Sequence, residues 1–252
     1  MAMEFEGYFN KQAPDYKAFR PDYPDALYEA LADRLERREQ AWDAGCGSGQ
    51  STVKLADWFQ EVIGTDLSEE QLSHAPPVAN VTYHVGPAER STLPDGAVDL
   101  IASAQAVHWF NLEEFYGEVK RVARPDGSSR VALWTYNLPT VNEAVDDVLA
   151  HYYKRVVGAY WPKERRHVEK NYADLPFPFA GKETLTFTMT KEWSVTQYLG
   201  FLHTWSATQL YKEKKQEDPV EKIRMDLLKA WKWVDKNQTV TWPVTCLVGK
   251  AG

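Results

Sequence analysis

A glycine-rich run is the part of the sequence best suited to chemistry. It reads Asp43-Ala44-Gly45-Cys46-Gly47-Ser48-Gly49 and joins a β-rich apolar segment to an amphipathic one. Glycines at alternate positions allow tight turns and a close approach of the backbone to a ligand. The helix expected after Gly49 directs unpaired N–H donors and the positive end of its dipole at the same place. The run therefore predicts a binding site for a ligand with a polar or anionic group.

The spacing of these glycines separates two kinds of nucleotide site. A dinucleotide fingerprint needs a third glycine at G-x-G-x-x-G. That position is Gln50 counted from Gly45, and Thr52 counted from Gly47. An NAD(P)-dependent oxidoreductase is therefore a distant alternative, and the pattern that fits is Asp-x-Gly-x-Gly-x-Gly.

A second acid, Asp66, ends the next predicted strand, at about the distance from the glycines where nucleotide-binding folds place a ribose-binding carboxylate. Its two oxygens can accept hydrogen bonds from both hydroxyls of a ribose. The alternative is that Asp66 only caps the following helix, but Ser68 already has the type and position of that cap. We therefore predict that Asp66 binds a ribose.

His108 and Trp109 directly follow the fourth predicted strand, at the edge where open α/β sheets bind ligands. A histidine there can titrate near neutral pH and either deprotonate a hydroxyl or bind an anion. The alternative is a histidine that holds its turn through a backbone carbonyl. The position at the end of the strand favours a role in the pocket.

Arg20 and Cys46 have open roles. The Arg20 guanidinium either pairs with an anionic group of the ligand or lies at the surface with its stem packed on Tyr23. Cys46 would need a nearby base and an attackable substrate to act as a nucleophile. It is therefore predicted to be a small residue that fills space in the loop.

The elements that must position these residues alternate between strand and helix from about position 40 to 136. The predicted strands are 40–43, 61–66, 81–86, 98–104 and 129–136. Capping pairs at Ser68 with Gln71 and at Asn111 with Glu114 mark the starts of two helices, and a lead-in helix is predicted over 24–35. This rhythm predicts an open parallel sheet.

The pattern changes after Tyr136. A Thr140–Glu143 capping pair predicts a long helix, and an ordered loop is expected over 159–180. A strand at 184–193, two helices capped by Ser194 and Asp218, and a last strand at 239–248 follow. The late strands complete the sheet, and the helices are candidates for a lid over the strand ends.

Composition excludes several classes of protein. The 252 residues, 44% hydrophobic and 26% charged, suit one folded α/β domain with a built-in lid. A net charge of −7 gives no general attraction to nucleic acid. Cys46 and Cys246 lack the spacing of a zinc site, so no metal is expected. A secretory signal and a membrane span are not seen either, and the expected location is the cytoplasm.

In its glycine motif and the strands around it, the sequence resembles the class I S-adenosylmethionine-dependent methyltransferases. The likeness covers about residues 40–136 and rests on the glycine motif, Asp66, the Ala88-Glu89 pair and the fourth strand, in that order. It implies a Rossmann-like, doubly wound α/β fold: a seven-stranded, mostly parallel sheet with an antiparallel last strand and a helical lid. Runs 16–24 and 104–110 resemble the trans-aconitate methyltransferase-like group of the type 11 methyltransferases.

The resemblance implies one domain over 1–252. Its parts are a lead-in at 1–39, a cofactor-binding core at 40–136, lid segments at 137–182 and 194–236, and the last two strands at 183–193 and 239–249. It also implies residues that bind S-adenosylmethionine and its product S-adenosylhomocysteine. They are Arg20, Asp43, Gly45, Cys46, Gly47, Gly49, Asp66, Leu67, Ala88, Glu89 and Gln105.

Within that set the glycine loop lines the methionine part of the cofactor, Asp66 takes the ribose, and Ala88 with Glu89 borders the adenine. One position departs from the wider family, because Pro87 stands where an acid commonly binds the adenine amino group. That bond must come from elsewhere or be absent. Glu89 is the candidate to supply it, and a solvated acid beside Arg90 is the alternative.

The resemblance implies a small-molecule acceptor, while the net charge and the lack of a long apolar run predict no partner of nucleic acid or membrane. Candidate acceptor residues are His108, Trp109, Tyr160, Trp161 and Trp205, although most aromatic rings are expected to be packing. A carboxylate acceptor, which the group suggests, is ionised at neutral pH and needs no general base, whereas a phenol or amine would need one such as His108. The alternative from another class is a cofactor-binding protein without transferase activity. A monomer or weak homodimer is expected.

Overall fold

The computed structural model describes residues 19–252, so Tyr16 and the rest of the first predicted run before Phe19 lie outside the described residues. The chain divides into two compact units. The sheet unit comprises Asp22–Asn137, Arg166–Phe187 and Val244–Gly252, and the helical unit comprises the described residues 19–21, Leu138–Arg165 and Thr188–Pro243. No helix within 19–252 is both long enough and apolar enough to cross a membrane.

The described residues form one sheet of seven strands in the order β3-β2-β1-β4-β5-β7-β6. The strands are β1 (Gln40–Ala44), β2 (Glu61–Asp66), β3 (Val81–Val85), β4 (Leu100–Ala104), β5 (Arg130–Tyr136), β6 (Ala180–Trp193) and β7 (Gln238–Lys250). Strands β1 to β5 pair in parallel, whereas β7 runs antiparallel to β5. The predicted doubly wound, mostly parallel sheet with an antiparallel last strand is confirmed.

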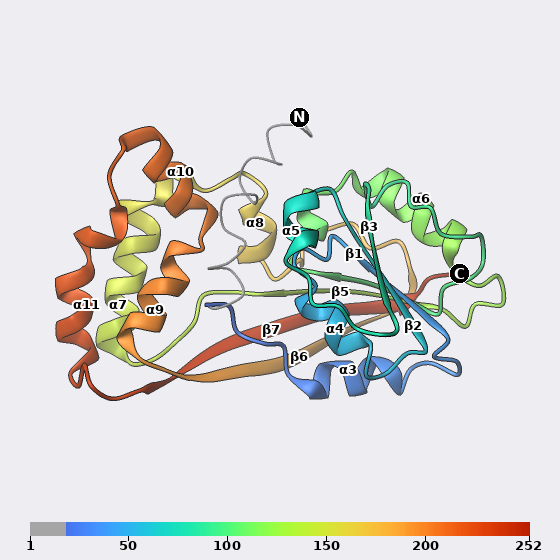
Figure 1. Cartoon of the computed structure of the whole chain (residues 1–252), viewed down its shortest axis with the longest axis horizontal. Coiled ribbons are helices and arrows are strands. Elements are labelled where there is room, and N and C mark those ends of the chain that lie inside the picture. The colour runs from blue at the N-terminus through green and yellow to red at the C-terminus, as the bar shows by residue number, and fades with distance from the viewer. Residues whose placement is uncertain (1–18) are drawn as a thin grey trace. The chain divides into compact units, whose positions relative to one another are not determined.

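The central strands are buried on both faces, which explains their nearly continuous apolar runs. On one face Trp42, Ile101 and Leu133 share a core cluster with Phe115 of α6 (Leu112–Val122). Helices α3 (Asp25–Ala32) and α4 (Gln50–Leu55) lie on the other side of the sheet from α6, as Figure 1 shows. The α3 helix is the predicted lead-in helix. A sheet covered on both faces can expose a binding site only at the ends of its strands.

Two predicted helix starts have the expected caps. Ser68 accepts a hydrogen bond from the Gln71 N–H at the start of α5 (Glu69–Ser73). Ser194 and Gln197 form a complete capping box at the start of α9 (Val195–His203). Both caps are local, so the sequence contained all that was needed to predict them.

One predicted cap is wrong, and another is confirmed only in its position, since Asn111 is the N-cap residue of α6 and its side-chain amide donates to Glu114 Oε1 at 2.9 Å. Asn142, not Thr140, caps α7 (Glu143–His151), because Thr140 is held in extended conformation by a β-bridge to Thr241. The capping box predicted at Asn111 is not formed at the start of α6, because the Asn111 backbone N–H donates to Glu89 Oε1 at 2.8 Å. In both cases the backbone N–H of the expected cap residue donates to a residue distant in sequence, Thr241 for Thr140 and Glu89 for Asn111.

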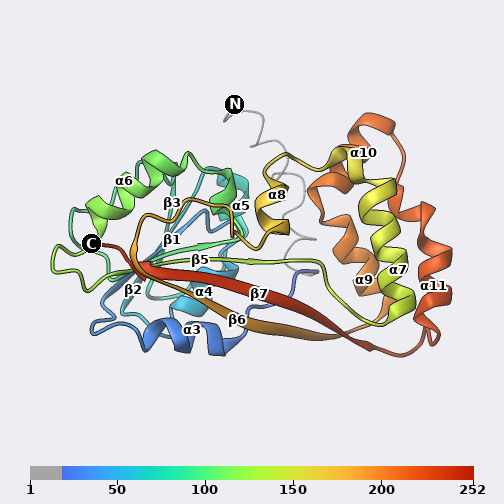
Figure 2. The same ribbon diagram turned by 180° about the vertical axis from the view of Figure 1, so that it is seen from behind.

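The helical unit contains α7, α9, α10 (Ser206–Lys215) and α11 (Arg224–Trp231), together with short turns at η2 (Tyr152–Val156), η3 (Gly158–Tyr160) and η4 (Pro219–Lys222). Figure 2 shows α7, α9 and α11 side by side. The predicted loop over 159–180 contains η3 and a short helix, α8 (Arg165–Glu169), and is in that respect wrong. The predicted domain limits stay a prediction.

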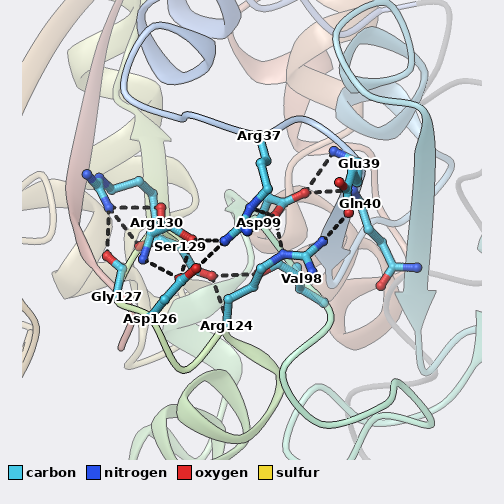
Figure 3. Close-up of polar contacts among 11 residues, drawn as sticks. Arg37, Glu39, Gln40, Val98, Asp99, Arg124, Asp126, Gly127, Ser129 and Arg130 are labelled. Carbon is cyan, nitrogen blue, oxygen red and sulfur yellow. Dashed lines mark hydrogen bonds and ion pairs between the residues drawn. The ribbon is translucent and has the colours of Figure 1, made fainter.

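An ion-pair network joins the amino ends of β1 and β4, at the edge opposite the candidate residues. The Asp99 side chain is 2% exposed, and its Oδ2 accepts hydrogen bonds from the backbone N–H groups of Glu39 at 2.8 Å and Gln40 at 3.0 Å. Its Oδ1 accepts from Arg124 Nε at 2.5 Å, and Figure 3 shows these contacts. The buried carboxylate thus links three segments of the sheet unit.

An Asp99→Asn variant is expected to lose about 2–3 kcal/mol of unfolding free energy, the size of hydrogen bonds to a charged group. The amide brings an N–H₂ group against existing donors. Urea denaturation measures the loss, and Asp126→Asn, at the exposed end of the same network, is the control expected to change little. An Asp99→Asn protein as stable as the wild type would contradict the role given to this carboxylate.

Candidate functional site

The glycine motif, Asp66 and the turn after β4 meet at the carboxyl edge of the sheet. The strand order reverses between β1 and β4, which is where open α/β sheets bind ligands. The Gly45 and Cys46 N–H groups donate to the Thr65 carbonyl at 2.8 and 3.0 Å, which seats the loop against the end of β2. A Cβ on Gly45 would lie 2.7 Å from the Ala106 Cβ, so the turn after β4 closes the other side.

Gly47 is the motif glycine with an open side. Gly45, Gly47 and Gly49 all have positive φ, at 70°, 55° and 79°. A Cβ on Gly49 would collide with the Tyr83 hydroxyl, whereas a Cβ on Gly47 would meet a single atom, at 3.9 Å. The backbone of Gly47 is therefore the part of the loop that a ligand can approach closely.

The Asp66 carboxylate is fixed at the end of β2 by backbone donors. Its Oδ2 accepts from the Gly47 N–H at 2.8 Å, and its Oδ1 accepts from the Ser68 N–H at 2.9 Å. Burial raises the pKa of Asp66, and these N–H groups oppose that shift. Each carboxylate oxygen has a second lone pair, so both can still accept a hydroxyl. Leu67 beside it is 44% exposed and offers an apolar surface.

Asp43 is completely buried beneath the motif. Thr52 Oγ1 donates to Asp43 Oδ2 at 2.7 Å, while Oδ1 has no hydrogen-bond partner among residues 19–252. Burial raises the pKa of Asp43 to about 7. A buried carboxylate oxygen without a donor is unfavourable until a cation or an N–H group approaches it. The position therefore suits a ligand that carries positive charge.

Tyr83 belongs to this site, and the sequence reasoning missed it. Its ring crosses Gly64 of β2, where a Cβ would lie 2.8 Å from the Tyr83 Cδ1, and its hydroxyl reaches Gly49. That hydroxyl is buried and has no hydrogen-bond partner in the described part of the chain. Burial raises the pKa of Tyr83 to about 12. Gly64 in the middle of a buried strand was the available signal, since such a glycine marks a close approach.

Three further predicted cofactor residues already make contacts within the sheet unit. Ala88 is 4% exposed and packs in the core cluster beneath α6. Glu89 accepts from the Asn111 N–H. Gln105 has a positive φ of 57°, and its side-chain amide donates to the Tyr136 carbonyl and accepts from the Tyr136 N–H, both at 3.2 Å. Their contact with a cofactor stays a prediction.

His108 and Trp109 lie in the 3-10 turn η1 (Val107–Trp109) that directly follows β4. The His108 Nδ1 is 2.9 Å from the Tyr172 hydroxyl, and the Trp109 ring centroid is 4.9 Å from the imidazole centroid. Tyr172 is completely buried. The sheet unit therefore places a histidine with a fixed partner at its carboxyl edge, as predicted from the position of His108.

Arg20 belongs to the helical unit. Its Nη2 donates to the Thr204 carbonyl at 3.0 Å, and its guanidinium lies over the Phe201 ring at 5.4 Å. These contacts anchor the side chain within that unit. The pairing of Arg20 with an anionic group of the ligand stays a prediction.

Three of the aromatic residues predicted to contact the acceptor belong to the helical unit. The Trp161 and Trp205 ring centroids are 5.4 Å apart, Trp205 is nearly buried, and Tyr160 is half-buried. The Arg165 guanidinium lies 4.9 Å from the Trp161 ring, and its Nε donates to the Tyr153 hydroxyl at 3.0 Å. These contacts fix the plane of the guanidinium.

Two comparisons identify the family. The model of the family described as Methyltransferase domain matches residues 42–131. A protein of Dictyostelium discoideum that carries a methyltransferase name is 36% identical over 254 residues, which cover 98% of this chain and 96% of that protein. The chain therefore belongs to the class I S-adenosylmethionine-dependent methyltransferases, and S-adenosylmethionine is its methyl donor.

Two further relatives agree. CRG1 of Saccharomyces cerevisiae, named as a probable S-adenosylmethionine-dependent methyltransferase, is 33% identical over 183 residues, covering 66% of this chain and 61% of that protein. A solved structure from Anaeromyxobacter dehalogenans, described as a type II methyltransferase, is 39% identical and superposes with a TM-score of 0.85. The match covers 92% of this chain and 98% of that one, so the likeness extends over both the sheet unit and the helical unit.

Proposed function

We propose that this enzyme methylates a small-molecule carboxylate and that Gly47 and Asp66 bind the methyl donor. The observation that carries the binding proposal is the hydrogen bond from the Gly47 N–H to Asp66, which joins the open part of the loop to the carboxylate. In this proposal Asp66 accepts the ribose hydroxyls, Leu67 covers one side of the adenine, and the unpartnered Asp43 oxygen lies beneath the positively charged methionine part.

These residues fit the group they are proposed to hold. S-adenosylmethionine supplies a methyl group that its sulfonium charge has already activated for displacement by a nucleophile. The protein therefore needs to hold the acceptor in line with the methyl group and to exclude water. Fixed backbone donors at Asp66 and a fixed loop at Gly47 provide rigid positions for that task. The transfer itself therefore needs little acid, base or nucleophilic catalysis by side chains.

Two features support a carboxylate as the acceptor. Run 104–110 resembles the trans-aconitate methyltransferase-like group. In the helical unit, the Arg165 guanidinium lies against the rings of Tyr153 and Trp161, and a guanidinium can bind a carboxylate with two parallel hydrogen bonds. A carboxylate is ionised at neutral pH, so its methylation needs no general base. A hydroxyl acceptor, the second candidate, would need a base, and His108 is placed at the sheet edge where one would act.

A His108→Gln variant distinguishes these acceptor classes. If the acceptor is a carboxylate, glutamine keeps a hydrogen-bond donor of similar reach, so most of the turnover is expected to remain. The wild-type rate should then show no loss that follows histidine protonation as the pH falls toward about 6. Single-turnover transfer from bound S-adenosylmethionine, measured from pH 5.5 to 9, separates the methyl transfer from product release. The compounds tested as acceptors in this measurement are small carboxylates, and each is compared with the corresponding amide and alcohol.

The opposite result has a clear signature. If the acceptor is a hydroxyl, the glutamine variant loses the base and the rate falls by about 10²–10⁴. The wild-type rate then declines below the ordinary histidine pKa of about 6.5. That combination, with transfer to the alcohol analogues, would replace carboxylate methylation by hydroxyl methylation.

A further inference from the structure

We propose that Tyr172 is a positioning residue that keeps the proton of neutral His108 on Nε2, so that this histidine acts as a hydrogen-bond donor and not as a base. What the donor binds rests on the proposed function. The effect of Tyr172 on the imidazole does not, because the two residues contact each other within the sheet unit.

The contact is short, and its tyrosine side is buried. The Tyr172 hydroxyl lies 2.9 Å from the His108 Nδ1, with the ring centroids 5.8 Å apart. Tyr172 is completely buried in the core cluster that includes Phe115 and Val119 of α6. Phenylalanine would fill the same volume in that cluster, so packing explains the ring but not the hydroxyl.

The backbone at Tyr172 gives an independent reason to look for a role. Asn171 and Tyr172 have φ of 51° and 61°, the left-handed region. This conformation is unfavourable for an L-residue and rare for a bulky side chain. The Tyr172 N–H donates to the His167 carbonyl at 2.8 Å and closes α8, a position where glycine would adopt the same angle at lower cost. A tyrosine at a strained position points to a use of its side chain.

Either group could donate in this contact, and we assign the donor from the ordinary chemistry of the two groups. A phenol hydroxyl is an effective donor, and the bare nitrogen of a neutral imidazole is an acceptor. In the proposed arrangement Tyr172 donates to Nδ1, which places the ring proton on Nε2. A histidine in this form can donate to an oxygen of an anionic acceptor, but its Nε2 has no lone pair with which to remove a proton. This tautomer therefore agrees with a carboxylate acceptor.

Nuclear magnetic resonance of protein labelled with ¹⁵N in histidine tests the tautomer directly. At about pH 8.5, two units above the ordinary histidine pKa of about 6.5, the ring is neutral and the two nitrogens give distinct signals. Assignment uses the signal lost in His108→Gln. We expect wild-type His108 to carry its proton on Nε2, and Tyr172→Phe to give a mixture with the Nδ1–H form. Tyr116→Phe is the matched control, since the Tyr116 hydroxyl donates to the Pro176 carbonyl at 2.6 Å in the same segment and leaves His108 untouched.

Activity supplies a second readout. Tyr172→Phe is expected to lower kcat/KM about 2- to 10-fold, the size of one neutral hydrogen bond. In a His108→Gln background the same change should have no further effect, because Tyr172 is proposed to act through His108. Equal losses in both backgrounds would assign Tyr172 a structural role only.

The failures of the two proposals are distinguishable. A wild-type spectrum with the proton on Nδ1, or an unchanged His108 spectrum in Tyr172→Phe, overturns the positioning role whatever the acceptor is. The wild-type spectrum decides the tautomer even if Tyr172→Phe does not fold. Transfer to alcohols and not to carboxylates overturns the proposed acceptor while the spectrum still reports the tautomer.

Discussion

A Gly47→Val variant is expected to lose S-adenosylmethionine binding altogether. Gly47 has a φ of 55° and an open side, so a side chain there would occupy the space through which the cofactor approaches the loop. Valine adds a branched Cβ to a backbone conformation that L-residues rarely adopt. Both effects act on the same N–H group that holds Asp66. Isothermal titration calorimetry measures the loss.

Backbone strain must be separated from obstruction of the site. Gly127→Val is the matched control, because Gly127 also has a positive φ, 73°, and open space around its missing side chain, but lies in the loop before β5. It should lose stability and still bind the cofactor normally. A folded Gly47→Val protein with unchanged affinity would mean that the ligand-binding loop has been misplaced.

The sequence predicted those parts of the fold that are encoded locally. The strands, the Ser68 and Ser194 caps and the glycine loop each depend on residues within a few positions of one another. The Thr140 cap failed because Thr241, a hundred residues later in the chain, holds that backbone in a bridge. No local pattern contains such a contact, so propensity alone favours the wrong residue.

The candidate site shows the same division. Gly47 and Asp66 could be found from motif and spacing, and the structure brings them within hydrogen-bond distance. Tyr83 could not, because its place against Gly49 depends on the gap that Gly64 leaves in the neighbouring strand. The hydrogen bond between Tyr172 and His108 joins segments 64 residues apart, and it depends on a backbone conformation that a tyrosine does not predict. Residues that act through packing and tautomer therefore need the three-dimensional fold.

Replacement of Asp66 by alanine is expected to weaken S-adenosylmethionine binding by about 1.5–3 kcal/mol, roughly 10- to 150-fold in affinity, while unfolding stays cooperative. The loss corresponds to hydrogen bonds from ribose hydroxyls to a charged group. The fold should survive, because burial raises the pKa of Asp66 and so disfavours its charge in the ligand-free protein. The Ser68 cap of α5 also remains.

A cofactor analogue that lacks the ribose 2′-hydroxyl separates direct binding from a loosened loop. If Asp66 accepts that hydroxyl, the wild type should discriminate against the 2′-deoxy analogue, and Asp66→Ala should bind both ligands equally weakly. If Asp66 only anchors the Gly47 and Ser68 N–H groups, the variant should weaken both ligands by the same factor and keep the discrimination. Calorimetric titration of both proteins with both ligands completes the cycle. Unchanged affinity of Asp66→Ala for S-adenosylmethionine would remove this carboxylate from the site, because neither the hydroxyl contact nor the anchoring of the loop could then matter to binding.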